Sequence, residues 1–219
     1  MTGIVIIGAE KFALEVASYV EGARSMDGQR FTVAGFLSLQ NEIAVTPEPC
    51  TAPFEPSRFH DRADTYVFAV SDPARRASMR AWIGPELHDR FPPLVHETTT
   101  VARSATIAAG ALVGPFCHVG VNATIGAFSI LNYQCGVGHH SRIGERVFLA
   151  PGFQCGNSAV IADGCFFGLG CVVGPGVAVG AATHAQAGTY IMEDIAGGML
   201  AFPSSRMKSI QRSSNHAKQ

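Results

Sequence analysis

Two adjacent histidines, His139 and His140, are the strongest candidates for chemistry in this sequence of 219 residues. They lie in the segment Gly-Val-Gly-His-His-Ser-Arg-Ile-Gly (136–144), among outward positions that otherwise carry small residues, prolines and scattered charges. An imidazole titrates near neutral pH, so it can take a proton from an amine or a hydroxyl group while a new bond forms. The segment therefore predicts a general base; the alternative is that both histidines are surface or subunit-contact residues.

A six-residue repeat must position these histidines. It runs without a break from Val95 to Ala196, and fourteen of its seventeen lead positions are Val, Ile or Leu. The position after the lead is Gly or Ala in thirteen hexads. Neither a helical period of 3.6 nor an alternation of 2 keeps this register, and a fixed short repeat indicates a parallel β-helix.

In such a coil, three hexads close one triangular turn of eighteen residues, with the lead aliphatic pointing to the axis. Residues eighteen apart then stack at roughly 4.8 Å, the usual spacing of paired strands. One predicted column is Val101, Val119, Val137, Cys155, Val173 and Ile191. The third residue of a hexad should point outward, which predicts an exposed His139 between Val121 and Asn157.

The N-terminal part alternates strands and helices. Strands are predicted at 3–8, 31–37 and 66–70, helices at 10–23 and 73–83, and a loop at 41–62. Asp72 and Pro73 fit the N-cap and first turn of the second helix. This order predicts a small open α/β domain with a parallel sheet over 1–90. The coil follows over 91–196, and 197–219 is predicted to be a C-terminal turn and polar tail.

Composition and charge exclude several classes of function. The chain is 47% hydrophobic and 15% charged, with a net charge of −1, so it has no basic surface that would favour nucleic acid. No run approaches the ~18 apolar residues of a membrane helix, which predicts a cytoplasmic protein with no membrane partner. The six cysteines are interpreted as free thiols, although Cys117 and Cys135 fall on adjacent coils where a disulfide is conceivable.

The turn after the first strand resembles a dinucleotide-binding fingerprint only weakly. It reads Gly-Ala-Glu-Lys-Phe-Ala (8–13), with a single glycine and with a carboxylate at Glu10 that would repel a phosphate. A nicotinamide cofactor is therefore not expected.

The whole chain resembles the bacterial hexapeptide-repeat sugar acyltransferases of the sialic-acid O-acetyltransferase and bacillosamine or perosamine N-acetyltransferase type. The resemblance covers about 1–207 and is carried by the hexads together with several short motifs. These are Ile-Val-Ile-Ile-Gly-Ala (4–9), Gly-Phe-Leu (35–37), Phe-Ala-Val (68–70), Leu-Val-His (94–96), Asn132 seven residues before His139, Ile-Gly (143–144) and Ala-Pro-Gly (150–152).

The resemblance implies a small Rossmann-like α/β domain, over 1–90, joined to a left-handed parallel β-helix. It also implies a homotrimer that binds acetyl-coenzyme A between neighbouring coils. It implies direct acetyl transfer to an amino or hydroxyl group of a sugar, most often a nucleotide-linked amino sugar, without a metal. His139 matches the general base, Asn132 an active-site asparagine, and the backbone near Asn157 a donor to the thioester oxygen. The positions that match the cofactor-binding residues are Asn157, Leu169, Ala187, Gly188 and Pro203. The positions that match the acceptor-recognising segments are Gly8, Ala9, Glu10, Lys11, Phe12 and Ser38.

Two departures from the family pattern leave alternatives open. An acidic residue usually follows the base histidine, where it can orient the ring, whereas this chain has His140, which could share that role. The acceptor segments at Gly8 and Ser38 also differ from the family's sequences. A non-catalytic scaffold or sensor is therefore one alternative. A zinc hydratase of the γ-carbonic-anhydrase type is another; its candidate ligands are His118, His139, His140 and His184, at spacings that do not match that family.

Overall fold

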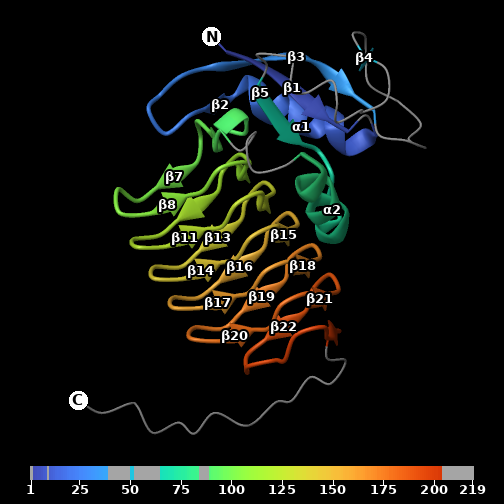
Figure 1. Ribbon diagram of the computed structural model, residues 1–219. Helices are drawn as coiled ribbons and strands as arrows, with labels where there is room; N and C mark the ends of the chain where they lie inside the picture. Colours follow the sequence, from blue (N-terminus) through green and yellow to red (C-terminus); the bar gives the residue numbers. More distant parts are fainter. Residues whose placement is uncertain (1, 9, 39–49, 52–64, 84–88, 204–219) are drawn as a thin grey trace, which may run out of the picture.

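The computed structural model describes residues 2–8, 10–38, 50–51, 65–83 and 89–203. It consists of a parallel β-solenoid of about six turns, with an N-terminal α/β layer packed on one end and one side of it (Figure 1). The predicted parallel β-helix is thus confirmed.

The solenoid has three faces, each a parallel sheet whose strands lie eighteen residues apart, except for the last step of one face, from β21 to β23, which is sixteen residues. The β13 face contains β7 (Thr100–Val101), β10 (His118–Val119), β13 (Gly136–Val137), β16 (Gln154–Cys155), β19 (Val172–Val173) and β22 (Tyr190–Ile191). The β14 face contains β8 (Thr106–Ile107), β11 (Thr124–Ile125), β14 (Arg142–Ile143), β17 (Val160–Ile161) and β20 (Ala178–Val179). The β15 face contains β6 (Leu94–His96), β9 (Leu112–Val113), β12 (Ile130–Leu131), β15 (Phe148–Leu149), β18 (Phe166–Phe167), β21 (His184–Ala185) and β23 (Leu200–Ala201). The predicted column from Val101 to Ile191 is the inward column of the β13 face.

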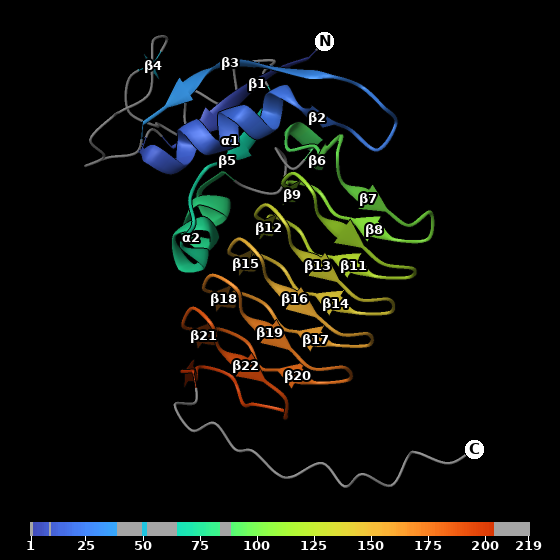
Figure 2. The same cartoon turned by 180° about the vertical axis from the view of Figure 1, so that it is seen from behind.

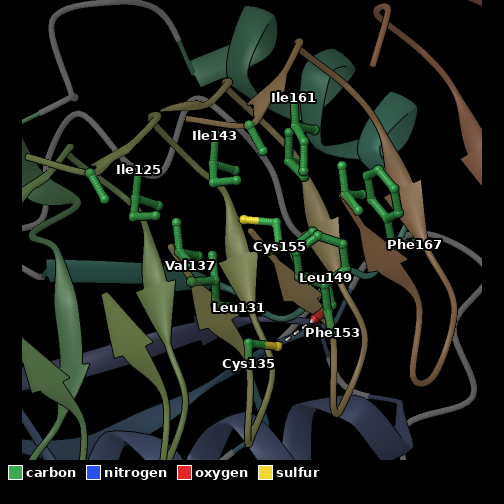
Figure 3. Packing of buried hydrophobic residues seen from close by; sticks show 14 of the residues in the cluster. Ile125, Leu131, Cys135, Val137, Ile143, Leu149, Phe153, Cys155, Ile161 and Phe167 are labelled. Atoms are coloured by element: carbon green, nitrogen blue, oxygen red, sulfur yellow. Dashed lines mark hydrogen bonds between the residues drawn. The ribbon is translucent and has the colours of Figure 1, made fainter. Parts of the chain in front are cut away.

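The interior of the solenoid is filled as the hexads predict. Lead aliphatics and the small residues of the second inward position form one continuous buried cluster. At position 155 the lead residue is a cysteine, which is smaller than the usual aliphatic residue, and the inward residue two positions earlier is the larger Phe153. The ring centroids of Phe153 and Phe167 lie 4.9 Å apart (Figure 3). Volume is therefore conserved along the axis, as dense packing requires. The five cysteines of the coil are buried free thiols, Cys117 and Cys135 among them.

The N-terminal layer is a four-stranded parallel sheet in the order β4-β3-β1-β5, made of β1 (Thr2–Ile7), β3 (Phe31–Leu37), β4 (Cys50–Thr51) and β5 (Thr65–Phe68). Helix α1 (Lys11–Glu21) follows β1 and α2 (Pro73–Ile83) follows β5. The predicted N-cap is confirmed, because the Asp72 carboxylate accepts a hydrogen bond of 3.0 Å from the Arg75 amide.

The outward side chains of the β15 face belong to the core of the N-terminal layer. Leu94, Leu112, Ile130 and Phe148 are buried in one cluster with residues of α1, β1 and β3. Helix α2 packs beside the solenoid near β15 and β18 (Figures 1 and 2). Arg80 of this helix forms a 3.0 Å ion pair with Glu145, and the Arg76 guanidinium donates a 2.7 Å hydrogen bond to the Arg146 carbonyl.

Three strands depart from the sequence-based expectations. Within the segment expected to be a loop, 41–62, Cys50–Thr51 pairs with β3; the rest of that segment lies outside the described residues. Strand β2 (Ala23–Arg24) was not predicted, and it pairs antiparallel with β6, so the N-terminal layer shares a sheet with the coil. The ladder also continues past Ala196, because Gly198 (φ 71°) makes a turn that lets β23 pair with β21.

Within the described ranges, neither helix has the length and apolarity needed to cross a bilayer.

Candidate functional site

The turns that join the β13 face to the β14 face form one edge of the solenoid, the His139 edge, which also includes Asn122, His140 and Asn157. In Figures 1 and 2 this edge lies on the side of the coil opposite α2. Each turn needs one residue in the left-handed region, and φ is 56° at Asn122, 60° at His140 and 59° at Ser158. The side chain before that residue projects outward, which leaves His139 exposed as predicted.

His139 and His140 face each other. Their Nδ1 atoms lie 3.0 Å apart and their rings are nearly perpendicular, at 89°. The far nitrogen of His140, Nε2, lies 3.0 Å from the amide nitrogen Nδ2 of Asn122, on the preceding coil. The Nε2 atom of His139 is left as the nitrogen that can meet a substrate. The pair can therefore act as a base and its orienting partner.

The coils pack very tightly beside His139. A methyl carbon at Gly138 would lie 2.6 Å from the Asn157 amide nitrogen and 2.5 Å from the Gly156 carbonyl carbon, so only glycine fits there. Among the described residues, the Asn157 N–H donates to no backbone carbonyl, whereas the neighbouring Ser158 N–H donates to the His139 carbonyl at 2.9 Å. The edge thus offers an imidazole and, one coil further, a backbone donor that is free for a ligand.

Asn132 lies at a different edge of the solenoid. It follows β12 in the turn to the β13 face, is 3% exposed, and packs under Tyr19 of α1. Its Oδ1 accepts a 2.9 Å hydrogen bond from the Tyr133 amide and contacts the Tyr19 hydroxyl, which also donates to the Glu15 carboxylate at 2.7 Å. Within one chain the structure does not bring Asn132 to His139.

Replacing Tyr19 with phenylalanine is expected to cost about 1 kcal/mol of stability near pH 8, since a buried hydrogen-bonding hydroxyl is lost. Burial, and then the Glu15 carboxylate, raises the pKa of Tyr19 above its ordinary value of about 10. The folded protein therefore keeps this proton at a pH where the unfolded chain releases it, and stability falls as pH rises beyond about 10. Urea unfolding followed by circular dichroism should show the deficit of Y19F shrinking between about pH 8 and pH 11. A constant difference across that range would contradict the assignment.

The residues predicted to bind the cofactor divide between two edges. Asn157 is on the His139 edge. Leu169, Ala187, Gly188 and Pro203 are exposed on the same edge as Asn132, which we call the Asn132 edge. Leu169 and Gly188 are joined across adjacent coils by a 2.8 Å hydrogen bond from the Gly188 amide to the Leu169 carbonyl. The two groups therefore border opposite sides of the β13 face.

The predicted acceptor segments lie at the carboxyl ends of β1 and β3, on the α2 side of the molecule (Figure 2). Gly8 is buried at φ 126°, and a methyl carbon there would lie 2.8 Å from the Ala69 carbonyl oxygen. Glu10 is the exposed N-cap residue of α1, and its side chain makes no capping bond. Lys11 is exposed, Phe12 packs edge-on against Phe148, and Ser38 is half-buried. Ala9 lies outside the described residues.

The histidines considered as zinc ligands do not gather in one place. His118 is on the β13 face and His184 on the β15 face, where its ring stacks on that of Phe166 at 4.5 Å. In the part of the chain that the structure describes, no group of three or more His, Cys, Asp and Glu side chains is arranged to hold a metal ion.

Several solved structures share this architecture over nearly their whole length. A perosamine N-acetyltransferase from Caulobacter crescentus, solved with CoA and GDP-perosamine, is 22% identical, covers 92% of this chain and 94% of its own, and has a TM-score of 0.78. The acetyltransferase domain of PglB from Neisseria gonorrhoeae, solved with acetyl coenzyme A, is 21% identical. The match covers 94% of this chain and 98% of that domain, with a TM-score of 0.75. WeeI from Acinetobacter baumannii is 20% identical, and the match covers 91% of this chain and 96% of WeeI, with a TM-score of 0.71. This chain has their fold.

The likeness to these enzymes is one of structure rather than of sequence. No protein-family model matches the chain, and no curated protein matches it in sequence. Two further structures of the Caulobacter enzyme, with the same two ligands, carry asparagine or alanine in place of one histidine.

Sequence reasoning missed Asn122 and Tyr19. The column rule contained the signal for Asn122, because it lies eighteen residues before His140 and must stack on it. Tyr19 carries no such signal, since its contact with Asn132 spans 113 residues between two parts of the fold.

Proposed function

We propose that this protein is an acetyl-CoA-dependent acetyltransferase that acts on an amino or hydroxyl group of a sugar, and that its acceptor is a nucleotide-linked amino sugar. The observation that carries the proposal is the exposed His139 imidazole, with one nitrogen held by His140 and the other free, next to an unused Asn157 N–H. The same fold in one enzyme solved with CoA and GDP-perosamine, and in another solved with acetyl coenzyme A, supports the choice of both substrates.

In the proposed reaction the acceptor nitrogen attacks the thioester carbonyl carbon, and the carbon–sulfur bond then breaks. His139 takes the proton that the acceptor loses, and coenzyme A leaves as a thiol after gaining a proton. The Asn157 N–H donates to the thioester oxygen as negative charge develops there, and such a preorganised donor can contribute about 3 kcal/mol of transition-state stabilisation. No covalent enzyme intermediate is required.

We propose that the protein works as a homotrimer in the cytoplasm, built on a left-handed coil. Support for the trimer comes from the division of the candidate site. His139 and Asn157 border one side of the β13 face, whereas Leu169, Ala187, Gly188 and Pro203 border the other, together with Asn132. A groove between two chains would join the His139 edge of one to the Asn132 edge of the next. A catalytic role for Asn132 requires this arrangement.

The N-terminal layer, residues 1–90, is proposed to be a Rossmann-like acceptor-binding domain, and the coil from residue 91 the transferase domain. Gly8, Glu10–Phe12 and Ser38 lie on the side of the molecule opposite His139, so the acceptor domain of one subunit would serve the imidazole of another. Sedimentation analysis of the purified protein tests this, since a monomer that retains full activity would contradict it.

Incubation with labelled acetyl-CoA and a panel of nucleotide sugars tests the activity itself. Transfer of label to an amino sugar, with release of free thiol, is the expected result. A thermal shift with CoA distinguishes the alternative of a non-catalytic scaffold: a protein whose melting temperature CoA does not raise, and which transfers no label, is not this enzyme.

A further inference from the structure

Three polar side chains form a line on the His139 edge. The amide nitrogen Nδ2 of Asn122 lies 3.0 Å from Nε2 of His140, and Nδ1 of His140 lies 3.0 Å from Nδ1 of His139. A half-turn of the amide would place its oxygen at the same contact. Asn122 is itself fixed, because its backbone N–H donates a 3.1 Å hydrogen bond to the Ser104 hydroxyl. Its φ of 56° suits asparagine better than most residues. The line therefore begins at a rigid point one coil away from the base.

The direction of hydrogen bonding along this line is set by its first member. A neutral imidazole has one N–H donor and one acceptor nitrogen, and an amide offers an oxygen acceptor or an NH₂ donor according to how it is turned. If the Asn122 oxygen faces His140, His140 donates from Nε2 and accepts at Nδ1. His139 must then donate from Nδ1, which leaves the lone pair of its Nε2 free. If the Asn122 nitrogen faces His140, every bond reverses and His139 carries its proton on Nε2.

Only the first arrangement gives a general base at Nε2. It also suits the protonated imidazole, which donates from both nitrogens and still needs His140 as an acceptor. We infer that the Asn122 amide turns its oxygen toward His140, and that Asn122 is thereby a positioning residue that acts through His140 to select the His139 tautomer with a free Nε2. This inference rests on the proposed function for its catalytic meaning. It assigns to a neutral amide on the preceding coil the orienting task that an acidic neighbour of the base performs in the family that the sequence resembles.

Two variants of Asn122 test the inference. Asn122→Gly removes the amide and tolerates the positive φ, whereas Asn122→Asp can only accept a hydrogen bond and so preserves the favourable direction. Ala182→Gly is the matched control, because Ala182 has the same φ of 56° in a turn at another edge. Melting temperatures of the three proteins show whether Asn122→Gly perturbs the fold more than the control does.

The first readout is nitrogen NMR of histidine-labelled protein at about pH 8.5, where free imidazoles are neutral. His139 and His140 signals are assigned with single glutamine variants. We expect His139 to be protonated on Nδ1 in the wild type and in Asn122→Asp, and to shift toward the Nε2-protonated form in Asn122→Gly. A wild-type His139 protonated on Nε2, or a tautomer that is the same in Asn122→Gly, would overturn the inference.

The second readout is steady-state kinetics. Asn122→Gly should lower kcat about tenfold while KM for acetyl-CoA stays within about twofold, and Asn122→Asp should restore kcat. Failure of the aspartate variant to exceed the glycine variant would contradict the role. If the wild-type protein transfers no acetyl group, the proposed function fails, and the NMR result still decides what Asn122 does.

Discussion

Replacement of His139 by alanine is expected to lower acetyl-transfer turnover by at least about 10²-fold, the usual contribution of a positioned general base. The His139 side chain is exposed and its ring contacts only His140 among the described residues, so the variant should fold normally. The free Asn157 N–H and the residues of the Asn132 edge remain. Binding of CoA, measured by calorimetry, should therefore stay close to that of the wild type.

The neighbouring histidine provides the control for that experiment. His140→Ala removes the partner that orients the base but leaves the base itself, so its loss of turnover should be much smaller, about tenfold. If His140→Ala proves the more damaging of the two, or if His139→Ala turns over normally, then the base has been assigned to the wrong ring.

Replacement of Arg76 by alanine is expected to cost about 3 kcal/mol of stability. Arg76 is fully buried in α2, and its guanidinium donates to the Val70 carbonyl at 2.5 Å, the Ser71 carbonyl at 2.9 Å and the Arg146 carbonyl at 2.7 Å. It also lies over the Phe148 ring, 5.8 Å from the centroid. Removing it leaves a cavity and takes the donor from three carbonyls, of which the one at Val70 is buried, where the N-terminal layer meets the solenoid.

A methionine at the same position separates packing from hydrogen bonding. Burial is the main cause that lowers the pKa of Arg76 to about 9, so its positive charge itself opposes folding at neutral pH. Arg76→Met keeps most of the volume and removes that charge, and it should lose only about 1–2 kcal/mol. Urea unfolding of the two variants measures the difference. Equal losses would mean that the hydrogen bonds to the three carbonyls, rather than the filled volume, account for the effect.

The solenoid was predictable because its physics is local and periodic. One rule, an inward aliphatic every six residues, fixes the strands, the stacking of residues eighteen apart and the outward direction of His139. The strand at 31–37 was likewise predicted from its run of apolar residues, and the helix at 73–83 from the Asp72 cap. Nothing periodic marks β2 or β4, because two-residue strands carry no pattern of their own.

The parts of the candidate site that escaped prediction depend on contacts between distant segments. Asn132 was assigned to the active site through the family resemblance, in a motif seven residues before His139, and a seven-residue step crosses one face of the triangle to another edge. The sequence does not indicate that Arg76 is buried, because a helix with three arginines suggests solvent exposure. Its burial depends on contacts with Phe148 and the Arg146 carbonyl, which belong to the solenoid. Such contacts follow from the packing of α2 on the solenoid and not from either sequence alone.

The outward residues Leu94, Leu112, Ile130 and Phe148 have a practical consequence for any exchange of the N-terminal layer, the part of the chain to which we have assigned acceptor binding. Because they lie in the core of the N-terminal layer, and because β2 shares a sheet with β6, a chimera joined at residue 90 would graft a foreign module onto a surface shaped for the original. A workable exchange has to carry the β15 face along with the module, or transplant only the loops at the carboxyl ends of β1 and β3.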